Sequence, residues 1–163
     1  MSRSVGERRR AREYALQLLF QLDLSPEGSP NATEAAVEEF WSGKKVVGPV
    51  RAFAEQIVLG TMGRLASFDA VLTSSAINWR VSRMPVVDRN ILRMAIFEFL
   101  FHPETPRVVV IDEAIEIAKK FGNEESGPFI NGILDSIRMK LENGDLELPA
   151  DLESAAREQR TIA

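Results

Sequence analysis

Five of the first twelve residues are arginines, and four of these stand close together at Arg8, Arg9, Arg10 and Arg12. We expect a helix to begin near Arg8, where cations oppose the helix dipole, so helix stability does not account for the cluster. Guanidinium groups bind phosphate through paired hydrogen bonds and stack on bases. The cluster is therefore a candidate contact for single-stranded RNA. The alternative is a basic terminus that is merely solvated.

A second candidate lies in residues 119–135, KKFGNEESGPFINGILD. Here we expect one helix to end, a polar loop to follow, and a new helix to carry Phe129 in its first turn. A ring beside basic residues can stack on a base, which is worth about 1–3 kcal/mol. Phe129 can equally be a core residue that fixes the helix start. We assign Asn131 to satisfying buried backbone groups and Gly132 to close helix packing, since both are poor helix formers.

The composition argues against several kinds of catalytic site. The chain has no cysteine, and its single histidine, His102, has no clear partner in the sequence. These counts argue against thiol chemistry, structural zinc and a Ser-His-Asp triad. The many carboxylates fit solvated helix faces, and no glycine-rich phosphate loop is present. We expect no catalytic residue, no metal and no cofactor.

Helical spacing of apolar residues dominates the 163-residue chain, and no segment alternates convincingly as a strand would. The elements expected to position the candidate residues are about seven helices, near residues 8–24, 33–42, 49–65, 68–79, 85–101, 106–121 and 126–143. Residues 25–33 are predicted to form a loop, with a helix cap at Asn31 or Thr33. Ser67 is expected to cap the fourth helix and Gly122 to end the sixth in a left-handed conformation. The fold class is all-α.

Residues 85–101, PVVDRNILRMAIFEFLF, are expected to form the central helix, because their second half is apolar on every side. The apolar run is shorter than the roughly 20 residues that a membrane span needs, and Arg93 and Glu98 interrupt it. The N-terminus has no small-residue cleavage site after its apolar part. We therefore expect a cytoplasmic protein without a membrane span.

Charge is distributed unevenly along the chain, whose formal net charge is −4. Residues 141–163 hold six acidic residues against two arginines. We divide the chain into one helical domain over residues 1–143 and an acidic C-terminal extension over residues 144–163. The extension is either disordered or one short exposed helix, and its low apolar density favours a frayed, solvating tail.

Phe20 does not follow the apolar stripe of the first predicted helix. That stripe contains Ala11, Ala15, Leu18, Leu19 and Leu22, whereas Phe20 falls almost opposite its centre. Phe20 is either exposed for a partner or packed under another helix.

Three segments together resemble the NusB family of bacterial transcription antitermination factors. They are RRRAREYALQLLFQLDL, VVDRNILRMAIFEFL and IDEAIEIAKKFGNEESGPFINGILD, and the similarity covers most of residues 8–141. The resemblance implies a helical bundle of two packed, three-helix-like lobes without enzymatic activity. It also implies binding of boxA RNA together with the small ribosomal protein NusE. Such a complex helps RNA polymerase to read through termination signals and promotes ribosomal RNA synthesis.

The resemblance also implies roles for individual residues. Arg8, Arg9, Arg10 and Arg12 match the RNA-binding motif of the family. Phe129 matches an aromatic residue implicated in RNA contact, and Glu125 matches an acidic residue that borders the RNA. Phe20 and Asp88 match positions on the surface that faces NusE, which favours an exposed Phe20. Other members can have tyrosine at the position of Phe20, so a hydroxyl contact would be absent here.

Two other interpretations stay open from the sequence. One is a relative of the helical RNA-binding domain that is fused to ribosomal RNA cytosine methyltransferases, although no cofactor-binding α/β domain follows in this chain. The other is a helical protein-interaction or homodimerisation module, in which the arginines play no part.

Overall fold

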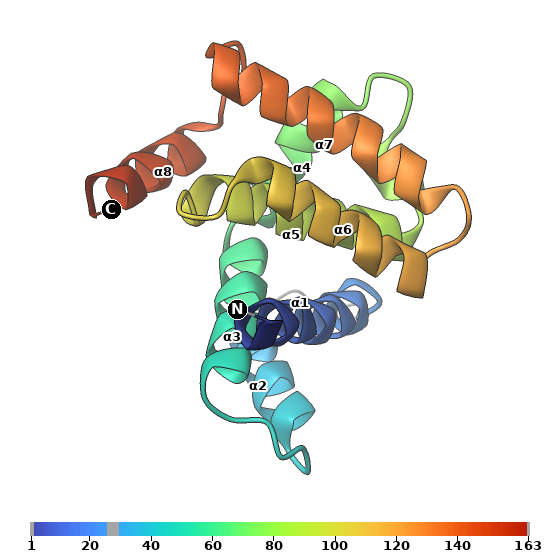
Figure 1. Cartoon of the computed structure of the whole chain (residues 1–163), viewed down its shortest axis with the longest axis vertical. Coiled ribbons are helices and arrows are strands. Elements are labelled where there is room, and N and C mark those ends of the chain that lie inside the picture. The colour runs from blue at the N-terminus through green and yellow to red at the C-terminus, as the bar shows by residue number, and fades with distance from the viewer. Residues whose placement is uncertain (1, 26–29, 163) are drawn as a thin grey trace. The chain divides into compact units, whose positions relative to one another are not determined.

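The computed structural model describes residues 2–25 and 30–162, and their regular structure is entirely helical. These residues form eight α-helices and one short 3-10 turn (Figure 1). The chain divides into two compact units, Met1–Gly63 and Arg64–Ala163, each a single stretch of sequence. The prediction of an all-α fold is confirmed.

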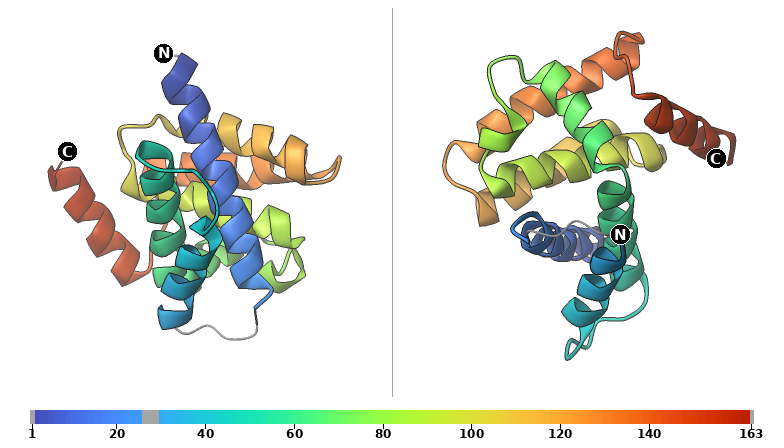
Figure 2. Two further views of the ribbon diagram at one scale, coloured as in Figure 1. Left: turned by 90° about the horizontal axis from the view of Figure 1, so that it is seen from below. Right: turned by 180° about the vertical axis from the view of Figure 1, so that it is seen from behind.

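The first unit contains α1 (Ser2–Asp23), α2 (Pro30–Trp41) and α3 (Pro49–Gly63). Each helix of this unit packs against the other two, and α1 and α3 share the largest contact (Figure 2). The predicted apolar stripe of α1 accounts for much of its buried surface, with Ala11, Ala15, Leu18 and Leu19 at most 1% exposed. The helix begins at Ser2, six residues before the predicted start near Arg8.

The connection between α1 and α2 is shorter than predicted. Of the loop expected at residues 25–33, residues 26–29 lie outside the described part of the chain. Helix α2 already begins at Pro30, a residue suited to the first turn because no N–H partner is needed there. Asn31 and Thr33 therefore both lie inside α2, where Thr33 is buried, and the predicted cap at either residue is wrong.

The second unit is built around α5 (Val86–Phe101), which packs against α4 (Leu65–Ser75), α6 (Arg107–Phe121), α7 (Ser126–Asn143) and α8 (Ala150–Ile162). Every residue from Ile91 to Leu100 is buried. The prediction of a central helix is thus confirmed. None of the described helices is both long enough and apolar enough to cross a membrane.

Helix α5 carries a buried cation whose partners tie it to α4. The Arg93 guanidinium donates from Nε and Nη2 to the two carboxylate oxygens of Asp69, at 2.7 and 2.8 Å. Its Nη1 donates to Asn90 Oδ1 at 3.1 Å. Because a buried charge is costly unless it is paired, this fork of hydrogen bonds fixes α4 against α5.

The C-terminal extension forms helix α8, so the frayed tail favoured from the sequence is not what the structure contains over residues 150–162. Leu152, Ala155 and Ala156 are buried, and α8 packs against α5. The Ser67 hydroxyl lies 2.8 Å from both carboxylate oxygens of Asp151. The extension is too polar for its three buried residues to stand out in the sequence.

Two other helix ends differ from the prediction. Helix α4 starts at Leu65 and ends at Ser75, so Ser67 does not cap it and Trp79 lies beyond it, before the 3-10 turn η1 (Val81–Arg83). Gly122, expected to be left-handed, has φ of −95°. What it lacks is space, because an added Cβ would lie 2.5 Å from Ser126 Oγ and 2.9 Å from the Ala118 carbonyl oxygen.

Candidate nucleic-acid interface

The arginine cluster lies on α1, about two to three turns inside the helix rather than at its start. Because α1 begins at Ser2 and the dipole acts mainly on the first turn, the predicted conflict with the helix dipole largely disappears. Arg8 and Arg10 are exposed, Arg9 is half-buried and Arg12 is only 4% exposed. The four side chains therefore differ in their access to a ligand.

Arg8 and Arg12, one helical turn apart, both lie over the ring of Phe53 on α3. Their guanidinium carbons are 4.4 and 5.5 Å from the ring centroid, within the range of cation–π attraction. Arg8 also lines a small hollow of about 110 Å³ with Glu7, Pro49 and Phe53. Burial against α3 leaves Arg12 little surface for RNA, contrary to the direct contact that the resemblance implies. Arg8 keeps an exposed side chain.

Arg10 has a different set of neighbours. Its Nη2 donates to the Tyr14 hydroxyl at 3.3 Å, and its guanidinium carbon lies 5.6 Å from the centroid of the Tyr14 ring. The Tyr14 ring packs edge-on against Phe40 and Trp41 of α2, at 6.1 and 5.3 Å between centroids. An aromatic cluster thus supports the base of an exposed arginine. This support was not predicted from the sequence, although the i, i+4 spacing of Arg10 and Tyr14 is the signal for it.

Phe20 is exposed, at 38% of its maximal surface, and Leu24 one turn later is 60% exposed. Of the two alternatives for Phe20, the structure therefore supports the exposed ring. Two apolar side chains near the end of α1 thus stay in contact with water and are available to a partner.

Glu125 and Phe129 lie together at the start of α7, in the second unit. Glu125 is exposed and directly precedes the helix, and the Phe129 N–H donates to its carbonyl oxygen at 3.1 Å. Phe129 is half-buried, with its ring 5.4 Å from that of Trp79 at an interplanar angle of 73°. Phe129 is therefore neither a fully buried core residue nor a fully exposed one.

Asp88 does not lie on a surface in the structure, contrary to the partner-facing position that the resemblance implies. It is only 3% exposed, and its Oδ1 accepts a hydrogen bond of 2.7 Å from the Ser126 hydroxyl. The same hydroxyl accepts from the Asn123 N–H at 3.0 Å. Burial raises the pKa of Asp88, and the Ser126 hydrogen bond offsets part of that rise. Asp88 thus fastens the turn before α7 to the start of α5.

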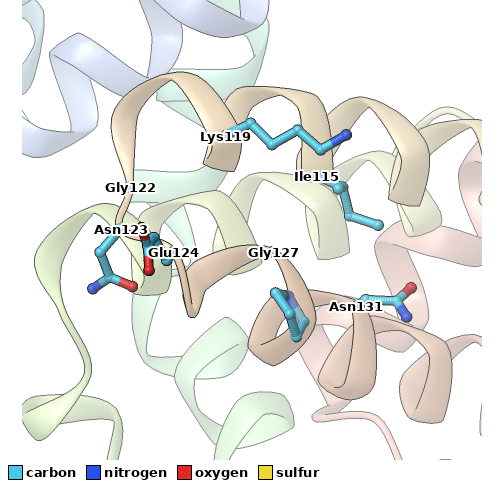
Figure 3. A pocket seen from close by; sticks show the side chains of 8 residues that line it. Ile115, Lys119, Gly122, Asn123, Glu124, Gly127 and Asn131 are labelled. Carbon is cyan, nitrogen blue, oxygen red and sulfur yellow. The ribbon is translucent and has the colours of Figure 1, made fainter.

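An open pocket of about 760 Å³ borders this turn, on α6 and α7 (Figure 3). Ile115 and Lys119 line it from α6, and Gly127, Pro128 and Asn131 from α7. Glu125 and Phe129 are not among its lining residues. The pocket lies next to the candidate RNA residues without including them.

The structural roles assigned to Asn131 and Gly132 from the sequence are wrong. Both residues are exposed, and Asn131 lines the pocket. An ideal Cβ on Gly132 would meet no atom within 4 Å, so no close packing requires glycine there. Both residues lie on the outer face of α7, off the stripe formed by its buried residues Ile130, Ile133, Leu134 and Ile137.

The chain is similar to known proteins over most of its length. The model of the NusB family matches residues 9–139. The Transcription antitermination protein NusB of Desulforapulum autotrophicum is 44% identical over 145 residues, covering 88% of this chain and 100% of the relative. That of Sorangium cellulosum is 41% identical over 137 residues, covering 84% and 95%.

Solved structures show the same fold. T. maritima NusB superimposes with a TM-score of 0.71 at 34% identity, covering 90% of this chain and 96% of that one. A chain from a complex of the antitermination factors NusB and NusE with double-stranded RNA has a TM-score of 0.71 at 23% identity, covering 82% and 96%. The matched region runs from Arg9, within the arginine cluster, to Met139 in α7, and over that length sequence and fold agree: this chain belongs to the NusB family.

Proposed function

We propose that this protein is a transcription antitermination factor that binds boxA-type single-stranded RNA together with NusE. In this role it supports processive transcription of ribosomal RNA operons by an RNA polymerase antitermination complex. The names of its relatives support the role, and so does the solved NusB–NusE–RNA complex, whose NusB-like chain has the same fold. The structural observation that carries the proposal is the pair of exposed arginines, Arg8 and Arg10, on α1.

Binding, rather than turnover, is the proposed activity. Arg8 and Arg10 are exposed on a helix that also packs against α2 and α3, so a rigid element carries their charges. A guanidinium can pair with a phosphate and stack on a base from the same position. Glu125 and Phe129 add a carboxylate and an aromatic ring to the proposed RNA contacts. The cytoplasm, where transcripts are made, is the proposed location.

The proposed NusE-facing surface is centred on Phe20. The support for it is the exposure of Phe20 and Leu24 together with the correspondence of Phe20 to the partner-facing position of the family. We do not include Asp88 in this surface, because its side chain is buried and holds the turn before α7.

Fluorescence anisotropy with a boxA-like RNA and a base-scrambled control, each with and without purified NusE at moderate salt, tests the proposal. We expect preferential binding of the boxA-like RNA, and tighter binding when NusE is present, because a second contact within one complex forms at high effective concentration. Equal weak binding to both RNAs that is indifferent to NusE would contradict the proposal. It would favour the protein-interaction or homodimerisation module instead.

The partner surface has its own test. Phe20→Asp should weaken NusE binding at least tenfold and leave the circular dichroism spectrum unchanged, since a charge replaces an exposed ring. Val47→Asp is the matched control, because Val47 is 78% exposed on the loop before α3. Unchanged NusE affinity for Phe20→Asp would remove this surface from the proposal.

A further inference from the structure

The connection between α4 and α5 presents a tryptophan to solvent. Its two ends are anchored, since Ala76 is 5% and Met84 is 3% exposed. Between these anchors Ile77 is 87% exposed and Trp79 is 55% exposed. The Trp79 N–H donates to the Ala76 carbonyl at 3.0 Å, so the backbone of this exposed turn is held in place.

Trp79 continues the aromatic surface that begins at Phe129. The two rings meet nearly edge to face, at 5.4 Å and 73°. In such a pair one ring presents its edge to the face of the other, so at least one face of each ring stays free of the partner ring. More than half of the surface of Trp79 stays in water, although burying apolar area would stabilise the fold. Packing against Phe129 therefore covers only part of the Trp79 side chain and does not account for the rest of its apolar surface.

Two arginines accompany the indole. Arg80 and Arg83 are exposed, and neither side chain makes an ion pair or hydrogen bond within the described residues. They are one turn apart, because the Arg83 N–H donates to the Arg80 carbonyl at 3.0 Å. Arg89 Nη1 lies 3.4 Å from the Ser82 carbonyl, a contact that ties the 3-10 turn to α5. An exposed indole and two uncompensated cations are thus fixed on one ordered turn.

We propose that Trp79, Arg80 and Arg83 form an additional RNA-binding surface, on which a base of single-stranded RNA stacks on the indole and the arginines contact its phosphates. The inference rests on the proposed function and extends it to residues outside the arginine cluster of α1. Stacking on an exposed ring beside cations is the way single-stranded RNA is commonly held. The two arginines lack acidic partners of their own, which favours an anionic polymer over an apolar protein surface.

The fluorescence of Trp79 itself provides the first test. The chain has two tryptophans, and Trp41 is buried in the first unit at 3% exposure. In a Trp41→Phe variant the remaining tryptophan emission comes from Trp79 alone. We expect saturating boxA-like RNA to quench this emission and to protect it from acrylamide. Emission and acrylamide access that do not change while anisotropy shows the RNA bound would overturn the inference.

Substitutions provide the second test. Trp79→Leu, which keeps an apolar side chain beside Phe129 but has no ring, should weaken RNA binding about fivefold or more, the low end of base–aromatic stacking. Trp79→Phe should stay within about threefold of the unmodified protein, and Ile77→Ala on the same turn should change nothing. RNA affinity equal for Trp79→Leu and the unmodified chain would overturn the inference.

Different results would overturn this inference and the proposed function. Loss of NusE affinity with unchanged RNA affinity in Trp79→Leu would overturn the inference and assign the surface to a protein. RNA binding that survives with no quenching would overturn it and leave the proposed function standing. Absence of RNA binding by the unmodified protein, even with NusE, would overturn both.

Discussion

Asp88 is a carboxylate that the fold buries where α5 begins. Burial raises its pKa, so the native state holds this proton more tightly than the unfolded chain does. The stabilisation from protonated Asp88 is complete below the unfolded pKa of about 3.9, and it is lost as the pH rises through the native pKa. At neutral pH the buried charge therefore costs stability.

Asp88→Asn should reveal this cost. The amide oxygen can still accept from the Ser126 hydroxyl, but the side chain no longer ionises. We expect the free energy of unfolding of the variant, relative to that of the unmodified protein, to increase as the pH rises from the unfolded to the native pKa of Asp88. Urea denaturation at a series of pH values measures this difference. A difference that falls with rising pH would show that the native pKa of Asp88 is not raised.

Two glycines of the second unit form a matched pair of predictions. Gly132→Ala places a Cβ in open space on the exposed face of α7, so the variant should be more stable by about 0.5–1 kcal/mol. Gly122→Ala should instead destabilise, since its Cβ would press on Ser126 and on the Ala118 carbonyl. Chemical denaturation measures both. Equal effects of the two substitutions would contradict the packing described for the turn before α7.

Helix α8 is the element that the sequence described least well, and its attachment can be tested at one residue. Leu152 is fully buried, so Leu152→Ala should lower the free energy of unfolding by about 2–5 kcal/mol. Ile162→Ala on the same helix is the control, because Ile162 is 81% exposed. If both variants unfold at the same denaturant concentration as the unmodified protein, then α8 does not dock in solution.

The helices that the sequence predicted well are those with long apolar periodicity. Predicting the buried stripe of α1 and the second half of α5, which is apolar on every side, required no tertiary information. The exposure of Asn131 and Gly132 did not require it either, because the apolar stripe of α7 leaves both positions off the buried face. The ends of α4 did require it. Asp88 shows the same limit at the site, because no sequence spacing pairs it with Ser126, which is 38 residues away. The support of Arg10 by Tyr14 was within reach of the i, i+4 rule.

At the scale of the whole molecule, the salt dependence of RNA binding measures how many phosphates the basic side chains of the protein neutralise. Each phosphate neutralised on single-stranded RNA contributes about −0.7 to the slope of log K against log salt concentration. Replacing both Arg8 and Arg10 with alanine should therefore flatten the slope by about 1.4. Anisotropy titrations between low and moderate salt measure it.

The matched control replaces Arg157 and Arg160 of α8 with alanine, which removes the same charge from an acidic segment. We expect this control to leave the slope unchanged. An equal change in both double variants would mean that net charge, and not the position of the arginines on α1, governs RNA binding. Arg12→Ala should act mainly on stability, because Arg12 is buried over Phe53.

The division of the fold into two uninterrupted stretches of chain also bears on how the protein is made. Residues 1–63 include all three helices of the first unit, so α1 has its partners α2 and α3 before α4 is translated. Proteins are synthesised from the N-terminus at about 5–20 residues per second, which is slow compared with helix formation and packing. The unit that carries the arginine cluster can therefore assemble on the ribosome while the second unit is still being synthesised.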